Sequence, residues 1–294
     1  MIAIRAYDAG QDLDATFELW RRSLGRRWPV ARADFAGRLR TGLVAARGGR
    51  LAGIALHAHA GDAASLQLLL VEPELERGGI GGQLHEAFLA GLAGRGVARV
   101  RLGGTPGPYL WPGVPAGLTA ARRAFAAWGW AFDETCWDLT RSLADYRTPV
   151  DVRAPDHPGI ACRWTTPADR NAIVAFERAH FPQWADSFAA DPAAVFVAVE
   201  ADGSIVGSLI ATDGSRPHLW RHLLGEATGS INAVGVAEHG RGLGIGTFLV
   251  ASACAALHNR GVDMCHIGWT SLLGFYGRLG FRPWRRYELA TRRV

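Results

Sequence analysis

The sequence predicts a mixed α/β protein made of two similar domains in tandem, each a central mixed β-sheet flanked by helices. The first observation is an internal repeat, because residues 66–100 align without a gap on residues 231–265 at a shift of 165. The second is that each copy runs through a strand, a glycine-containing turn, a helix and a further strand, an order typical of α/β domains. The third is a stretch rich in proline and charge between the copies. We therefore expect domains at 1–145 and 160–294, joined by a linker at 146–159.

The elements follow in the same order in both copies. Residues 4–20 and 162–179 each lead from a short strand through a polar turn into a helical period. Residues 42–56 and 195–210 each predict two strands around a turn. The repeated helices carry apolar residues three and four positions apart and end at a glycine, Gly96 or Gly261. Downstream, 125–130 matches 276–281 at a shift of 151, so the first copy has gained 14 residues within 103–118.

Composition excludes several classes of protein. The 294 residues are 49% hydrophobic, which is ample for two cores. Every Lys or Arg position is an arginine. Residues 1–150 hold 18 arginines against 14 acidic residues, and residues 151–294 hold 14 against 13. Neither half therefore has the basic surplus that would predict a nucleic-acid partner. No apolar run reaches a membrane-spanning length and no leader is evident, which predicts a cytoplasmic protein without a membrane partner. The four scattered cysteines predict neither disulfides nor a metal site.

The stretch 239–250, HGRGLGIGTFLV, is the most informative turn. It places Gly242, Gly244 and Gly246 where a strand gives way to a helix. The first amides of a helix have no partner within it, and bare glycines would let a large anion approach them, with a hydroxyl from Thr247. A nucleotide P-loop is excluded because the chain has no lysine. A dinucleotide fingerprint does not fit either, because the glycines alternate.

A second motif follows about 30 residues later, Tyr276-Gly277-Arg278-Leu279-Gly280-Phe281. Together with Arg241-Gly242-Leu243-Gly244-Ile245-Gly246, it resembles the GNAT family of acetyl-CoA-dependent N-acyltransferases, so the chain is similar to a tandem GNAT protein. The resemblance implies acetyl-CoA as co-substrate and no metal. It implies that the pantetheine arm pairs with the backbone of Val234, Gly235 and Val236, and that the diphosphate lies on residues 241–247. It also implies that Tyr276 protonates the departing thiolate.

The first copy departs from this pattern at two positions. Glu76 stands where the second copy has Arg241, and Phe125 stands where it has Tyr276. A carboxylate at the mouth of an anion site and the loss of a proton donor both argue against catalysis. We therefore expect the first domain to be non-catalytic. The apolar, proline-rich insertion at 105–115 is interpreted as a site wall or plug rather than a disordered loop.

Transfer to an amine requires that the ammonium first lose a proton to a base. Glu226 is the preferred candidate, over Asn232, His218 and His222. We expect the acceptor pocket to be lined by the connection at 213–230 and by 180–188. Its aromatic residues would contact the body of the acceptor and its acidic residues a cationic amine: Trp184, Phe188 and Trp220, and Asp186 or Glu226.

The predicted function is therefore transfer of an acetyl group to a primary amine of a small molecule, such as an amino sugar, by direct attack in a ternary complex. Three alternatives remain. They are a non-catalytic acyl-CoA sensor or scaffold, an acetyltransferase for proteins or peptides, and a tRNA-dependent aminoacyl transferase. The acceptor, the acyl chain length and the oligomeric state, including a homodimer, stay open at this point.

Overall fold

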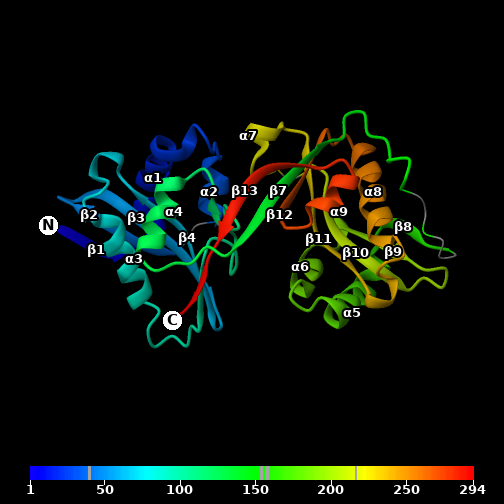
Figure 1. Cartoon of the computed structure of the whole chain (residues 1–294), viewed down its shortest axis with the longest axis horizontal. Helices are drawn as coiled ribbons and strands as arrows, with labels where there is room; N and C mark the ends of the chain where they lie inside the picture. Colours follow the sequence, from blue (N-terminus) through cyan, green and yellow to red (C-terminus); the bar gives the residue numbers. More distant parts are fainter. Residues whose placement is uncertain (39–40, 153–154, 156–158, 216) are drawn as a thin grey trace. The chain divides into compact units, whose positions relative to one another are not determined.

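The computed structural model describes residues 1–38, 41–152, 155, 159–215 and 217–294. The chain forms two compact units (Figure 1). Unit 1 comprises Met1–Trp137 together with Arg285–Val294, and unit 2 comprises Asp138–Trp284.

Unit 1 is built on a sheet with the strand order β1-β2-β3-β4-β5-β14. All its pairs are antiparallel except β4 and β5, which run parallel from the pair Ala63–Arg99 to the pair Leu66–Leu102. The strands are β1 Ile2–Ala6, β2 Gly42–Arg47, β3 Arg50–Ala60, β4 Ala63–Val71, β5 Arg99–Leu102 and β14 Thr291–Arg293. The helices are α1 Ala9–Trp20, α2 Arg32–Arg38, α3 Ile80–Ala90 and α4 Thr119–Ala127.

The second sheet has the strand order β6-β13-β7-β12-β11-β10-β9-β8. Its strands are β6 Val114–Pro115, β7 Glu134–Ser142, β8 Ala161–Trp164, β9 Val195–Val199, β10 Ile205–Thr212, β11 Thr228–Val236, β12 Met264–Thr270 and β13 Arg282–Leu289. The helices of unit 2 are α5 Arg170–His180, α6 Ala185–Ala190, α7 Arg221–Leu224, α8 Ile245–His258 and α9 Leu273–Arg278.

The central strands of unit 2 are covered on both faces. Because successive residues of a strand point to opposite faces, neighbouring positions on β10 and β11 show which helix covers which face. A Cβ on Gly207 would lie 3.3 Å from Leu249 of α8, whereas a Cβ on Gly235 would lie within 2.4 Å of the Phe181 ring at the end of α5. Leu249 is fully buried, as the apolar spacing of its helix predicts. We call the two faces the α8 face and the α5 face.

The compact units divide the chain differently from the predicted domains. Residues 138–145 lie in unit 2 and residues 285–294 in unit 1, whereas the prediction assigned them to 1–145 and 160–294. The reason is strand pairing: β7 lies beside β12, and β14 pairs with β5. Of the predicted linker 146–159, residues 153–154 and 156–158 lie outside the described residues. Its first residue is anchored, because the Tyr146 hydroxyl donates to the carbonyl of Ala251 in α8.

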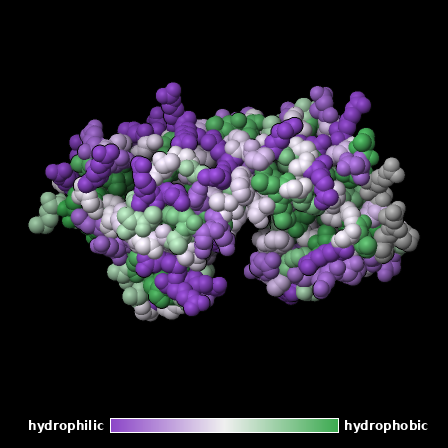
Figure 2. Space-filling view, in the orientation of Figure 1, coloured by the Kyte–Doolittle hydropathy of each residue, from purple (hydrophilic) through white to green (hydrophobic). Residues whose placement is uncertain are grey.

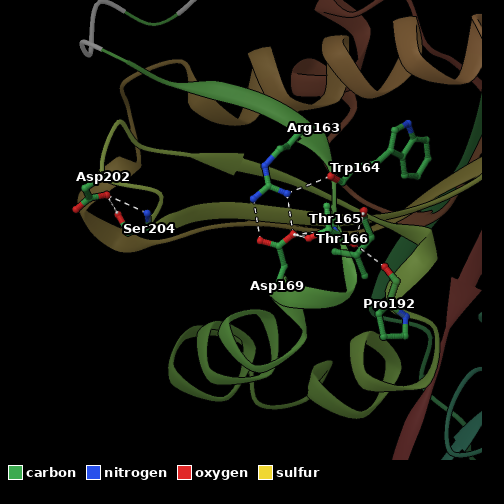
Figure 3. Close-up of polar contacts among 9 residues, drawn as sticks. Arg163, Trp164, Thr165, Thr166, Asp169, Pro192, Asp202 and Ser204 are labelled. Carbon is green, nitrogen blue, oxygen red and sulfur yellow. Dashed lines mark hydrogen bonds and ion pairs between the residues drawn. The ribbon is translucent and has the colours of Figure 1, made fainter.

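A polar network fixes the start of α5 (Figure 3). Asp169 accepts hydrogen bonds from the amide and hydroxyl of Thr166, a capping-box arrangement, and both its oxygens bind the Arg163 guanidinium at 2.8 Å. The Arg163 hydrogen bonds hold the pKa of the Asp169 carboxyl well below its usual range. Unit 1 has a similar pair, since Arg5 binds both oxygens of Asp12 in the first turn of α1. The shared network supports a common origin of the two copies.

The visible surface mixes hydrophilic and hydrophobic residues on both units (Figure 2). Among the described residues, the exposed large hydrophobic side chains are scattered along the chain: Met1, Val150, Leu223, Leu243, Leu272 and Val294. No helix within the described part of the chain is both long and apolar enough to cross a membrane.

Candidate functional site

The site begins where two parallel strands of unit 2 diverge. β11 and β12 pair from Thr228–Met264 to Ser230–His266, yet β11 continues to Val236 and β12 to Thr270. The register of β11 against β10 also shifts between Ser208 and Ile210, and Ala233 takes a left-handed φ of 49°. A bulge leaves its extra residue out of the ladder and redirects the backbone. The predicted segment Val234–Val236 therefore lies directly beyond a bulge, on the part of β11 that continues past its last pair with β12.

The glycine turn leads from the end of β11 to α8. Gly242 and Gly244 have φ of 79° and 81°, a conformation that glycine adopts without steric cost. At Gly246 a Cβ would make ordinary contacts, 3.4 Å from Val236 and 3.7 Å from Phe275. Its predicted part in the anion turn stays a prediction. Residues 241–244 are exposed beside the first amides of α8, which have no partners inside the helix and carry its positive dipole end.

Arg241 is held at the mouth of this turn. Its Nε donates to the Val236 carbonyl at 3.2 Å, so the guanidinium is tied to the end of β11. The structure thus brings the predicted strand segment 234–236 and the predicted anion turn 241–247 into one continuous stretch of backbone.

Tyr276 lies on α9 and is 5% exposed. The rings of Phe275 and Phe281 meet it edge-on, with centroids at 4.8 and 5.9 Å. Burial raises the pKa of the Tyr276 hydroxyl to about 12, and the neighbouring Cys265 adds to the rise. A phenol with this pKa stays protonated at neutral pH and can act as a proton donor.

Glu226 is not brought to this place. Its side chain is 77% exposed in the turn before β11, within 3.8 Å of Arg221 and 4.0 Å of His222. It precedes Ala233 by seven residues, and at about 3.3 Å per residue a strand of that length spans roughly 23 Å. The preferred base thus lies before the start of β11, more than half the length of the strand away from the bulge.

Glu177, a fully buried carboxyl on the α5 face, was not among the residues predicted from the sequence. The Ser208 hydroxyl donates to its Oε1 at 2.5 Å, while Oε2 has no hydrogen-bond partner among the described residues. Burial raises the pKa of Glu177 to about 7, against the smaller opposing effect of Ser208. Ser208 pairs with Gly235, so this acid lies behind the predicted thioester segment. The signal was present in the sequence, because Glu177 follows Ile173 by four positions on the apolar stripe of its helix.

A second polar group lies on the strands before the bulge. The hydroxyls of Thr212 and Ser230 are 2.8 Å apart, and the Asn232 amide donates to Ser230 at 2.9 Å. Asn232 is exposed. We call Thr212, Ser230 and Asn232 the polar trio. It presents hydroxyl and amide groups to a polar ligand.

The residues predicted to line an acceptor pocket have different environments. Phe188 is 1% exposed and packs in the core with Ile173 and Val195, so that expectation was wrong. Trp184 stacks on Phe181 at 5.4 Å, and Asp186 is exposed. Trp220 is 3% exposed and meets Trp284 at 6.5 Å.

In unit 1, the corresponding face is covered by the insertion. At the repeat shift, Ser65 and Gln67 correspond to Ser230 and Asn232, but both donate to the carbonyl of Pro106, at 3.3 and 3.0 Å. Farther along the insertion, Trp111 packs against Trp20 at 5.3 Å. The insertion is therefore ordered and accepts hydrogen bonds from two polar residues whose counterparts in unit 2, Ser230 and Asn232, bond to each other.

The turn of unit 1 keeps its shape without the glycine pattern. Arg77 stands where unit 2 has Gly242 and takes a left-handed φ of 64°, and Gly79 matches Gly244 with φ of 81°. Phe125, at the position of Tyr276, is 8% exposed. Within the described residues, no group of His, Cys, Asp or Glu is suited to hold a metal ion.

Residues 161–281 match the model of the acetyltransferase (GNAT) family. A glucosamine N-acetyltransferase region of a fungal multi-domain β-N-acetylglucosaminidase superposes with a TM-score of 0.93 at 29% identity over 99% of this chain, which spans 38% of that protein. A GCN5-related N-acetyltransferase from Sphaerobacter thermophilus (TM-score 0.71, 21% identity, 99% and 95% of the two chains) has the same fold. So does a tandem GNAT protein from the clavulanic acid biosynthesis pathway (TM-score 0.69, 19% identity, 100% and 98%). No curated protein matches the chain significantly.

Proposed function

Because residues 161–281 belong to the acetyltransferase (GNAT) family and the whole chain has the fold of tandem GNAT proteins, we propose that unit 2 transfers an acetyl group from acetyl-CoA to a primary amine of a small molecule. The observation that carries the proposal is the divergence of β11 and β12. It begins after the pair Ser230–His266, and the part of β11 beyond the bulge at Ala233 leads to the exposed turn before α8. Acetyl-CoA has a thioester on a long arm with a diphosphate at its far end, so the arm matches the strand segment and the diphosphate matches the turn.

In this proposal the pantetheine arm adds to β11 as a further strand, pairing with the backbone of Val234, Gly235 and Val236. The diphosphate lies on the turn of residues 241–247, where the helix dipole and free amides favour negative charge. Arg241 adds a full positive charge there. The exposed position of that turn supports this arrangement.

The reaction follows by direct attack in a ternary complex. An acceptor amine that has lost its proton attacks the thioester carbonyl carbon, and a backbone amide of residues 234–236 donates to the oxygen that becomes negative. The C–S bond then breaks, and Tyr276 gives its phenolic proton to the sulfur. After the attack the nitrogen is positively charged and must lose one proton to become an amide nitrogen. It gives that proton to the Tyr276 phenolate through water. The phenol is protonated at neutral pH, so Tyr276 holds a proton to give when the thiolate leaves.

An amino sugar is the acceptor class that the surroundings support best. The polar trio, with its exposed Asn232, can hydrogen-bond a polyhydroxylated body. The name of the fungal relative at 29% identity refers to glucosamine. In unit 1 the covered polar positions, Glu76 and Phe125 together support a non-catalytic role.

The test is release of CoA thiol from acetyl-CoA with amino sugars, aminoglycosides, polyamines, amino acids and peptides, alongside calorimetric binding of CoA. We expect turnover with amino sugars and one CoA per chain. CoA binding without turnover on any amine would indicate a sensor, and turnover confined to peptides would indicate a protein acetyltransferase.

Tyr276→Phe should lower kcat by about 100-fold or more while leaving CoA affinity unchanged, because only the proton donor is lost. The matched control is Tyr7→Phe, which removes a buried hydroxyl of unit 1 that has no hydrogen-bond partner among the described residues. Equal kcat values in the two variants would exclude Tyr276 as the proton donor.

A further inference from the structure

His266 lies at the point where β11 and β12 part. It forms the last pair of the parallel ladder, with Ser230, and its side chain is only 9% exposed. Its Nε2 is buried and has no hydrogen-bond partner among the residues that the structure describes. The nearest acidic oxygen is Oδ2 of Asp138, at 3.4 Å. A buried imidazole nitrogen beside a carboxylate, yet without a formed hydrogen bond, is costly unless the pair tightens in some functional state.

Asp138 is fixed independently of the histidine. It lies on β7 with its side chain 5% exposed, and its Oδ1 accepts the backbone N–H of Trp269 at 3.1 Å. Trp269 has a left-handed φ of 52°, a rare conformation for a non-glycine residue that this hydrogen bond helps to hold. Asp138 therefore stabilises β12 beyond the divergence and at the same time directs its other oxygen towards His266.

The side chain of His266 lies on the α5 face of the sheet, together with the polar trio. Cys265, the residue before it, is fully buried towards Cys254 of α8, so His266 points the other way. Paired residues of parallel strands share a face, which puts His266 next to Ser230 and diagonal to the exposed Asn232. The position is thus at the point where β11 and β12 part, on the same face as the exposed Asn232.

Two rings border the imidazole. His218 meets it edge-on at 4.9 Å and Trp284 at 5.8 Å. The Nδ1 of His218 accepts the backbone N–H of Trp220 at 3.1 Å, so that nitrogen is occupied. Among the described residues, the titratable groups in contact with His266 are Asp138 from β7 and His218 from the segment after β10.

We propose that His266 is the general base of the acetyl transfer and that Asp138 is its positioning residue. This inference rests on the proposed function and names the residue that prepares the amine. Asp138 favours the tautomer with the proton on Nε2, which leaves the Nδ1 lone pair to take a proton from the acceptor ammonium, directly or through one water. The amine then holds the lone pair that attacks the thioester, and the imidazolium is stabilised by the carboxylate beside it. The histidine afterwards releases the proton to solvent.

The positioning residue comes from β7, a strand that begins in the first half of the chain. Asp138 lies on β7, before the predicted linker, so a second domain limited to residues 160–294 would lack it. The histidine of the second repeat and the carboxylate of the first meet in unit 2.

The test is the pH dependence of kcat for the full chain with its best amine. We expect His266→Gln to lower kcat at pH 7 by about 100- to 10,000-fold and to abolish the fall of kcat at acidic pH, while KM for acetyl-CoA is unchanged. Asp138→Asn keeps an oxygen acceptor for the Trp269 amide but removes the charge. It should cause a smaller loss and move the acidic limb to lower pH, because the imidazolium loses its anionic neighbour. Imidazole in the buffer should restore activity to His266→Ala. His258→Gln, at the end of α8, is the matched control.

The outcomes separate the two proposals. No turnover of any amine by the unmodified chain refutes the proposed function, and the base with it. Turnover that survives His266→Gln with its acidic limb intact refutes the base alone. If Glu177→Gln or Glu226→Gln abolishes the fall of kcat at acidic pH instead, that glutamate is the general base and His266 is not. Retained near-ultraviolet circular dichroism in each variant excludes misfolding as the cause of a loss.

Discussion

The buried carboxyl of Glu177 should make the stability of unit 2 depend on pH. Its pKa rises from 4.5 to about 7 on folding because burial penalises the charged form. Between these values the folded chain binds more protons than the unfolded chain, so stability falls as pH rises and is level again above about 7. A shift of about 2.5 units corresponds to about 3 kcal/mol, since one unit is about 1.36 kcal/mol.

Glu177→Gln isolates this contribution. Glutamine keeps an oxygen acceptor for the Ser208 hydroxyl and cannot ionise, so its amide resembles the protonated acid. We expect the variant and the unmodified chain to be equally stable near pH 4.5, and the variant to be more stable by up to about 3 kcal/mol at pH 8. Urea unfolding monitored by tryptophan fluorescence at several pH values measures the difference. A difference that stays constant from pH 4.5 to 8 would refute the reasoning, because it would mean that Glu177 does not titrate on folding in this range.

Two further predictions concern the glycine turns. Gly244→Ala forces a side chain into φ of 81° and should cost about 1 kcal/mol of stability and weaken CoA binding in calorimetry; Gly274→Ala, in α9 with open space around it, should change neither. In unit 1, Arg77→Gly relieves a left-handed arginine and should raise stability by up to about 1 kcal/mol in thermal unfolding. An unchanged or lowered melting temperature would mean that the Arg77 side chain makes compensating contacts.

The repeated local patterns were predictable from the sequence. Strand, turn and helix recur at a fixed shift because each is specified by neighbouring residues, such as the apolar spacing that buries Leu249 or the left-handed turn at Gly244. The bulge at Ala233 leaves no mark in the sequence, since alanine has no preference for φ of 49°. The course of β7 and β14 was also out of reach, because which strands pair over long distances depends on the sheet edges available after folding.

The groups that face the predicted site depend on those long-range pairings. Asp138 lies beside His266 only because β7 is next to β12, although the two residues are 128 positions apart in the chain. Glu226 was preferred because it is close to β11 in sequence, yet an extended strand places residues only a few positions apart many ångströms from each other. Proximity along the chain was therefore a poor guide to proximity at the site.

The two copies separate what the glycines do from what the polar residues do. Unit 1 keeps the left-handed turn even with Arg77 in it, so the turn's shape alone does not make a site. The differences lie in the groups that would meet ligands. Ser65 and Gln67 bond to Pro106, whereas Ser230 bonds to members of the polar trio and Asn232 is exposed. The same backbone thus carries two polar residues bound by the insertion in unit 1 and an exposed asparagine in unit 2.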